Sequence, residues 1–333
     1  MRSFARSRVP TARRWQQGVS IVEVMVALTL GLVAVAGAAA VYLANRQSFA
    51  TVESIARLEE NARFAMDLLS REIREAGNSV CGGAMISTNL VSASPNWAIW
   101  DTGLLGDVLV STATAGKIVG PTGGTAQLSG TNSLLVWSGS VKGTSFQITG
   151  HNNAAKTITT SDNTVYNAND VIVACDGSQL LTFEVANNAV NKTLTYSDPL
   201  SKSPQLSATG GAYLTSLTSH IWYVGGSTTQ TGATSLRRLT IKKDGTWGGP
   251  DNDEMVTGVT GLNIQYLLTN AAGLPSGANY LDASAVGAQW ALVSAVRLTL
   301  TMQTLDNAGS TGSASTVITH DVPLTVSIKV RMQ

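Results

Sequence analysis

The chain contains 333 residues, of which 44% are hydrophobic and only 13% are charged. This length allows one large or two modest domains, and the composition is typical of a β-rich, loop-rich extracytoplasmic protein. The formal net charge is +1, but residues 1–18 hold five arginines and no acidic residue. Without them, 17 basic side chains face 21 acidic ones, a formal net charge of −4. This balance argues against a broad nucleic-acid surface, which needs concentrated positive charge.

An uncharged apolar stretch runs from Val24 to Asn45, after the arginine-rich start. As a helix it reaches about 33 Å, enough to cross the hydrocarbon core of a membrane. Because the arginines precede it, the positive-inside rule keeps the N-terminus cytoplasmic and exports the rest of the chain. A secretory signal cleaved among the small residues 34–40 and a plain membrane anchor are two other interpretations. Neither accounts for Glu23, because a carboxylate at the edge of an apolar span is costly and usually has a partner.

The helical pattern continues beyond the apolar stretch, since no Gly or Pro lies between Ala38 and Ala76. Apolar residues recur every three or four positions and define one helical face. These residues are Ile55, Leu58, Ala62, Ala65, Leu69 and Ile73. Gly77 and Asn78 then supply a stop signal. We therefore expect one helix over residues 20–76, with a lipid-like first half and one face of the second half buried.

The stretch from Gln17 to Leu28 resembles the prepilin cleavage and assembly motif of type IV pilins. In that family a peptidase cuts after the glycine, on the cytoplasmic side, and methylates the new N-terminus. The resemblance implies cleavage between Gly18 and Val19, N-methylation of Val19 and a role in assembly for Glu23. Val19 departs from the usual phenylalanine, and the apolar span lacks the helix-bending proline of many major pilins.

Such a cleavage would create an ammonium group on Val19. In a filament of packed apolar helices, Glu23 of a neighbouring subunit can neutralise this charge. Burying either charge alone is expensive, so the pair would set the register between helices during assembly.

Residues 57–77 resemble the corresponding helix of PilW-type minor pilins, which ends in a glycine with a cysteine shortly after, here Gly77 and Cys81. Further stretches are similar to that family: 170–176, 235–238, 255–266, 280–283 and 290–300. The resemblance implies a minor pilin that primes type IV pilus assembly, lies at the filament tip, and supports adhesion and twitching motility. It implies no enzymatic activity, no catalytic residue and no cofactor.

The implied partners are other minor pilins, the major pilin, the prepilin peptidase, the inner membrane and a tip adhesin; nucleic acid is not expected. The chain would cross the inner membrane once, with a periplasmic C-terminal domain, and then enter the extracellular pilus. A type II secretion pseudopilin shares the same N-terminus and is the main alternative. A secreted adhesin or enzyme with an ordinary signal peptide is another.

The chain has two cysteines, Cys81 and Cys175. In an exported domain, two cysteines suggest one disulfide. It would close a loop of about a hundred residues and contribute about 4–5 kcal/mol in the chain-entropy model. Two free buried thiols are the alternative.

From Ile86 onward, short β-rich runs lie between Gly, Asn, Ser and Thr breaks. The expected strands are 107–112, 133–138, 144–149, 170–175, 180–186, 220–224, 236–242, 262–268, 292–304 and 317–331. Apolar residues alternate over 296–302 and 324–330, which indicates strands with one buried face. No strand–helix alternation appears, so a parallel α/β sheet is not expected.

The expected fold class is α+β: a long N-terminal pilin helix, membrane-spanning in its first half, packed on a large antiparallel β-rich C-terminal domain. We expect a leader over 1–18, a transmembrane and assembly half over 19–45, an amphipathic half over 46–77 and the exported domain over 78–333. A boundary near 201–211 could divide that domain into two lobes.

Candidate chemistry is sparse. His151, His220 and His320 are far apart in the sequence and none has metal-ligand spacing. An acidic, glycine-rich run over 242–254 could ligate Ca²⁺ through carboxylate oxygens. Its candidate ligands are Asp244, Asp251 and Asp253. The run lacks EF-hand spacing, so a solvated hairpin loop is the default.

A local basic cluster could contact DNA. Its members are Arg237, Arg238, Lys242 and Lys243. The acidic balance of the chain without its leader argues against that role.

Overall fold

The computed structural model describes residues 18–81, 86–91, 103–110, 118–121, 123–139, 145–162, 165–190, 192–199, 201–202, 204–207, 211–241, 252–270, 279–305 and 311–323. The chain divides into two compact units, Met1–Glu53 and Ser54–Gln333. The finer division expected from the sequence, including a lobe boundary near 201–211, stays a prediction.

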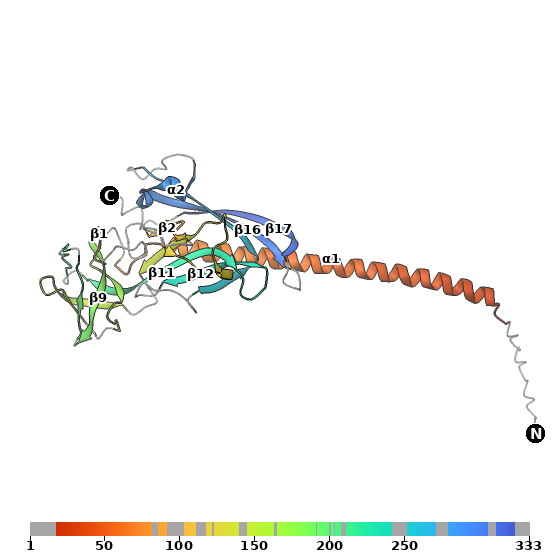
Figure 1. The fold of residues 1–333 in the computed structure, drawn as a ribbon, viewed down its shortest axis with the longest axis horizontal. Coiled ribbons are helices and arrows are strands. Elements are labelled where there is room, and N and C mark those ends of the chain that lie inside the picture. The colour runs from red at the N-terminus through yellow and green to blue at the C-terminus, as the bar shows by residue number, and fades with distance from the viewer. Residues whose placement is uncertain are drawn as a thin grey trace, which may run out of the picture. The chain divides into compact units, whose positions relative to one another are not determined.

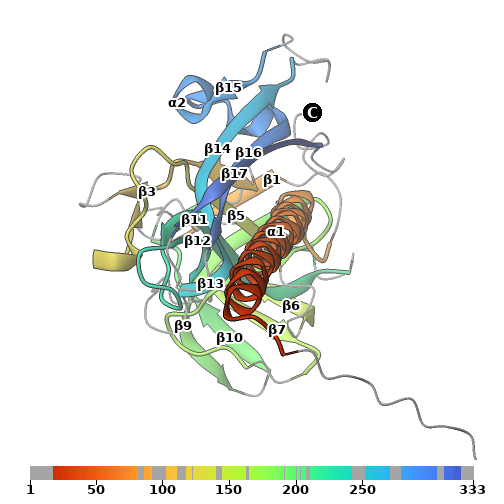
Figure 2. The ribbon, with the colours of Figure 1, turned by 90° about the vertical axis from the view of Figure 1, so that its right-hand side faces the viewer.

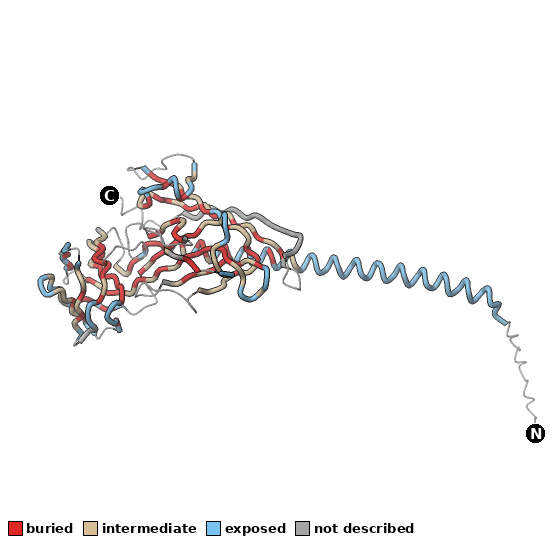
Figure 3. The backbone as a smooth tube through the Cα atoms, viewed as in Figure 1, coloured by how far each residue is buried: buried red, intermediate tan, exposed pale blue. Residues whose placement is uncertain are grey.

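A single helix, α1, runs from Ile21 to Glu75 (Figure 1). It confirms the helix predicted over residues 20–76. Every residue from Ile21 to Glu53 is exposed in the isolated chain, as the pale blue part of α1 in Figure 3 shows. By length and composition, α1 contains a stretch apolar enough to cross a membrane. This first part of α1 has the properties of a single-pass anchor.

The second part of α1 buries one face. Its buried residues are Leu58, Ala62, Ala65, Met66, Leu69, Ser70 and Ile73. The face predicted from the sequence is largely confirmed, but Ile55 is 38% exposed, because the core begins one turn later at Leu58. Met66 was missed. It lies four positions after Ala62, on the same side of the helix.

The helix ends as its sequence predicts. The N–H of Ala76 bonds to the carbonyl of Ile73, which tightens the last turn. Gly77 follows with φ of +69°, in the left-handed region that glycine enters without strain. Its N–H donates to the carbonyl of Trp137 at 2.8 Å, so the end of α1 is attached directly to a strand.

Eleven strands form the larger sheet (Figure 1). They are β1 (Ile86–Asn89), β2 (Leu104–Gly106), β5 (Leu134–Gly139), β6 (Phe146–Asn152), β7 (Thr157–Thr160), β8 (Val171–Cys175), β9 (Gln179–Val190), β10 (Thr193–Tyr196), β11 (Tyr213–Gly226), β12 (Thr234–Ile241) and β13 (Asn252–Thr257). All pairs are antiparallel except β1 with β9. Two short strands, β3 (Leu109–Val110) and β4 (Ile118–Val119), pair separately, and η2 (Gly123–Thr125) is a 3-10 turn.

Strand β11 lies at the centre of unit Ser54–Gln333. Its first residues pair with β6 and β8, and its later residues pair with β5 and β12. Its side chains alternate between two faces, as expected for a strand. Trp222 faces the cluster that contains α1, Ile221 faces a second cluster, and Leu214 belongs to a third. All three hydrophobic clusters therefore contain residues of β11.

The smaller sheet has the order β15–β14–β16–β17 and is entirely antiparallel (Figure 2). Its strands are β14 (Val259–Leu268), β15 (Leu281–Asp282), β16 (Val293–Leu305) and β17 (Thr311–Pro323). Two short turns, α2 (Ala283–Val286) and η5 (Trp290–Leu292), precede β16. The alternation predicted over 296–302 is confirmed, since all four alternating residues of β16 are fully buried against the cluster that contains α1.

The α+β class and the mainly antiparallel sheets are confirmed. Seven short strands were missed, namely β1, β2, β4, β7, β10, β13 and β15. β7 and β10 are rich in threonine, so they lack the apolar runs that marked the predicted strands. The last strand was expected over 317–331, and β17 begins six residues earlier, while residues 324–331 lie outside the described part of the chain.

Candidate processing and assembly site

The start of α1 is organised by Ser20. Its hydroxyl accepts the N–H of Val22 at 3.4 Å, and its carbonyl accepts the N–H of Val24 at 3.1 Å. Ser20 thus occupies the N-cap position, where a serine oxygen satisfies a free backbone donor. Glu23 stands three residues later, which is the spacing of a capping box. This N-cap was not predicted, although the pattern Ser-x-x-Glu before an apolar run is visible in the sequence.

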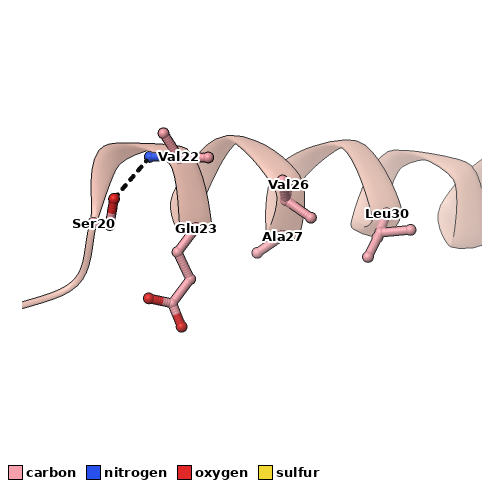
Figure 4. Close-up of a pocket in the computed structure, with 6 residues that line it drawn as sticks. All are labelled: Ser20, Val22, Glu23, Val26, Ala27 and Leu30. Carbon is pink, nitrogen blue, oxygen red and sulfur yellow. Dashed lines mark hydrogen bonds between the residues drawn. The ribbon is translucent and has the colours of Figure 1, made fainter.

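One side of the first helical turns forms an open, shallow depression (Figure 4). It is lined by Ser20, Val22, Glu23, Val26, Ala27 and Leu30. In Figure 4 the side chains of Glu23, Ala27 and Leu30 extend from the same side of the helix. The carboxylate is thus the acidic group of an otherwise apolar or small-residue surface.

Glu23 makes no hydrogen bond or ion pair with another residue in the part of the chain that the structure describes. Its place in the first turn favours a negative charge, because the helix N-terminus carries a partial positive charge. That interaction is small at an exposed site, about 0.3–1 kcal/mol. The carboxylate is therefore available for a positive partner outside the chain.

The bond between Gly18 and Val19 lies just before the helix. A Cβ placed on Gly18 would meet no atom within 4 Å, and the Val19 side chain is 67% exposed. Residues 1–17 of the predicted leader lie outside the described part of the chain. The described geometry leaves the bond accessible, and its cleavage and the methylation of Val19 stay predictions.

The predicted disulfide is present. Cys81 and Cys175 are bonded, with Cα atoms 5.9 Å apart. The bond joins the segment just after α1 to β8, whose Cys175 is fully buried. The disulfide is thus a second attachment of the end of α1 to the larger sheet, in addition to the hydrogen bond from Gly77.

A partly buried side-chain hydrogen bond also joins α1 to the sheet. His220 Nδ1 lies 3.1 Å from Glu72 Oε2, and both side chains are 17% exposed. Burial opposes ionisation of Glu72, but His220, Arg238 and Arg71 outweigh it and lower the pKa of Glu72 below its usual value. Residues 72 and 220 are far apart in the chain, so sequence reasoning had no signal for this pair.

The other sequence candidates do not form a site in the described residues. Asp253 pairs with Arg238 at 2.8 Å, whereas Asp244 and Asp251 lie outside the described part. Among the described residues no three His, Cys, Asp or Glu side chains gather as a metal site would require. The calcium hypothesis stays a prediction.

The basic cluster is not a continuous surface. Arg237 is 2% exposed and binds Asn252 and the carbonyl of Gly226, so its guanidinium is not available to DNA. Lys242 and Lys243 lie outside the described residues.

The family comparison concerns the C-terminal third of the chain. Residues 221–330 match the family PilW, described as Type IV Pilus-assembly protein W. No curated protein and no solved structure matches the chain. The matched residues include the later part of β11, the Arg237 region and the four strands of the smaller sheet. Over these residues the chain is similar to type IV pilus-assembly protein W, and this similarity supports a PilW-like protein involved in type IV pilus assembly.

Proposed function

We propose that this chain is a minor pilin that is cleaved between Gly18 and Val19, N-methylated on Val19 and incorporated into a type IV pilus. The observation that carries the proposal is the exposed carboxylate of Glu23, which has no partner among the described residues and lies in the first turn of α1, directly before the uncharged stretch Val24–Asn45. A charge placed there is costly in a membrane or between packed helices unless a positive group meets it. The new N-terminal ammonium of a neighbouring subunit is such a group.

The protein acts in this proposal as a structural subunit and not as an enzyme. Its anchor places the C-terminal domain in the periplasm, where the oxidising environment suits the Cys81–Cys175 disulfide. It primes assembly together with other minor pilins and the major pilin, lies at the filament tip, and supports adhesion and twitching motility. The similarity of residues 221–330 to PilW supports the pilus over the type II secretion pseudopilus.

Mass spectrometry of the mature N-terminus tests the processing step. We expect a chain that starts at N-methylated Val19 in cells with an active prepilin peptidase. A start near Ala40 would indicate an ordinary signal peptide, and retention of the arginine-rich leader would rule out processing. Gly18→Ala provides a sharp variant, because the space around Gly18 is open and the fold should tolerate it. Loss of cleavage in this variant would therefore reflect the peptidase and not misfolding.

The variant Glu23→Gln tests the assembly step. It keeps the size of the side chain and removes the charge, so membrane insertion and cleavage should persist while incorporation into sheared pili falls. Glu60→Gln, an exposed acid on the same helix, is the matched control and should incorporate normally. Equal incorporation of the Glu23→Gln and wild-type chains would exclude the charge-pairing role.

A further inference from the structure

His151, near the end of β6, binds a separate segment of the chain. This segment, Pro204–Ser207, is called the strap below. The backbone N–H of Leu206 donates a hydrogen bond to Nδ1 of His151 at 3.2 Å. Leu206 is 7% exposed and packs in the hydrophobic cluster that also contains Phe146 of β6. The imidazole therefore holds a strap that covers part of this cluster.

The hydrogen bonds fix the tautomer of His151. A backbone N–H can only donate, so Nδ1 must carry a lone pair and no proton. In the neutral ring the proton then lies on Nε2, which is 2.9 Å from the hydroxyl oxygen of Tyr196. The Tyr196 hydroxyl in turn donates to Oδ1 of Asn153 at 3.3 Å. Each of these three hydrogen bonds therefore has a defined donor and a defined acceptor.

Among the described residues, Lys156 and Tyr196 are the charged and titratable groups that act on His151, and Asp198 interacts with both of them. Lys156 lies in the turn between β6 and β7 and pairs with Asp198 at 2.8 Å. Tyr196 stacks on the imidazole, with ring centroids 5.8 Å apart. The strap has a second attachment, because the N–H of Ser207 donates to Asp176 at 2.8 Å. No carboxylate contacts the imidazole within the described residues, so a proton added at Nδ1 would gain no direct counter-ion there.

We propose that His151 is an acid-sensitive latch that fastens the strap when neutral and releases it when protonated. A second proton must enter at Nδ1, because Nε2 already carries one. The ring N–H would then face the N–H of Leu206, and two donors cannot share a hydrogen bond. The Leu206 bond must break, whereas the hydrogen bond from Ser207 and the apolar contacts of the strap do not depend on the protonation of His151.

The sign of the pH dependence follows from the surroundings. Burial, and then the ammonium of Lys156, lower the pKa of His151 below its usual value of 6.5. The folded-state pKa is thus lower than the unfolded one. The latch therefore contributes stability that is fully present above 6.5 and is lost as the pH falls through the lowered value.

Hydrogen exchange of the Leu206 amide, measured on the full chain in detergent micelles, tests the latch. We expect its protection to fall by up to about tenfold per pH unit as His151 is protonated. The amide of Ile221 in the core should stay protected over the same range. The ¹⁵N spectrum of His151 should show its proton on Nε2 at neutral pH.

Two variants separate the latch from other effects of acid. His151→Asn can place a carbonyl oxygen near the position of Nδ1, so it can accept the Leu206 N–H but cannot titrate. Its Leu206 protection should not depend on pH. His220→Asn is the matched control, because Nδ1 of His220 faces the Glu72 carboxylate instead of an N–H. This variant should keep the wild-type pH dependence at Leu206.

Several outcomes would overturn the proposal whatever the variants do. One is Leu206 protection in the wild-type chain that does not change with pH. Another is a proton on Nδ1 of neutral His151. A third is simultaneous loss of protection at Leu206 and Ile221, which would mean that acid unfolds the whole unit.

Discussion

The guanidinium of Arg237 lies 3.5 Å from the carboxylate of Glu254, and their side chains are only 3% and 9% exposed. Glu254 also accepts hydrogen bonds from the hydroxyl of Ser227 at 2.6 Å and from the N–H of Thr228 at 2.7 Å. Arg237 is on β12 and Glu254 is on β13. Ser227 and Thr228, which donate the two hydrogen bonds to Glu254, lie in the turn that follows β11. This pair therefore holds three consecutive strands together within the region similar to PilW.

Glu254 is expected to make stability depend on acid pH. Burial raises its pKa, but the hydrogen bonds from Ser227, Thr228 and Thr229 outweigh burial and lower it to about 2. Because the folded-state pKa lies below the unfolded value of 4.5, the contribution is present above pH 4.5 and is lost as the pH falls towards about 2. Urea unfolding of the wild-type chain should show this loss.

Glu254→Gln should remove that pH dependence and lower the free energy of unfolding by about 1–3 kcal/mol at neutral pH, because it leaves the buried Arg237 without its counter-ion. Glu60→Gln, at an exposed position on α1, should change it by less than about 0.5 kcal/mol. Equal stability of wild type and Glu254→Gln at neutral pH would contradict this account.

Position 106 requires glycine because the side chains of Tyr266 and Trp290 lie directly against it. A Cβ at this position would overlap the hydroxyl of Tyr266 and approach Cη2 of Trp290 to 2.9 Å. Gly106→Ala should therefore lower the free energy of unfolding by about 1–3 kcal/mol, as overpacking does. Gly124→Ala, with no atom within 4 Å of the added Cβ, is the control and should have little effect.

The contact between Gly106 and Tyr266 also predicts a substitution that should not lower the free energy of unfolding. The Tyr266 hydroxyl is buried without a hydrogen-bond partner among the described residues. Tyr266→Phe should thus be neutral or stabilising, since it removes an unsatisfied polar group. In this background Gly106→Ala should cost less than in the wild type. A double-mutant cycle of thermal unfolding measures the difference, and full additivity would contradict the proposed overlap.

Leu69 anchors the buried face of α1, with no exposed area. Leu69→Ala should lower the free energy of unfolding by about 2–5 kcal/mol, because it removes buried apolar surface and leaves a cavity. Phe64, on the same helix, is 51% exposed, and Phe64→Ala should cost far less. Chemical denaturation compares the two variants, and similar losses would show that the face is wrongly assigned.

Removal of the disulfide should destabilise the unit Ser54–Gln333. The Cys81→Ser/Cys175→Ser double variant is expected to lose about 2–5 kcal/mol of unfolding free energy, because the unfolded chain gains conformational freedom. Reduction of the wild-type chain should reproduce most of this loss, and the variant should not respond to reductant. A double variant as stable as the oxidised wild type would contradict the prediction.

Local periodicity explains what could be predicted from the sequence. The helix, its stop at Gly77 and the buried face around Leu69 follow from spacings of three and four residues. The alternation in β16 follows from spacing of two. Each of these signals lies within a few residues of chain, so no knowledge of the remaining fold is needed to detect it.

The contacts that give the sheets their specific arrangement were not predictable in this way. His151 meets Leu206 across 55 residues, and His220 meets Glu72 across 148. Such pairs depend on strand order and register, which no local pattern encodes. The Ser20 cap is different, because its spacing to Glu23 was visible in the sequence.

The participation of β11 in all three hydrophobic clusters limits how the unit Ser54–Gln333 can be divided into fragments. A fragment cut before Tyr213 would lose the strand that pairs with β8, and one cut within β11 would separate Leu214 from Trp222. Neither of the two resulting fragments would retain a complete hydrophobic core. A soluble piece for crystallisation or display should therefore start beyond the apolar part of α1 and keep everything from there onward in one polypeptide.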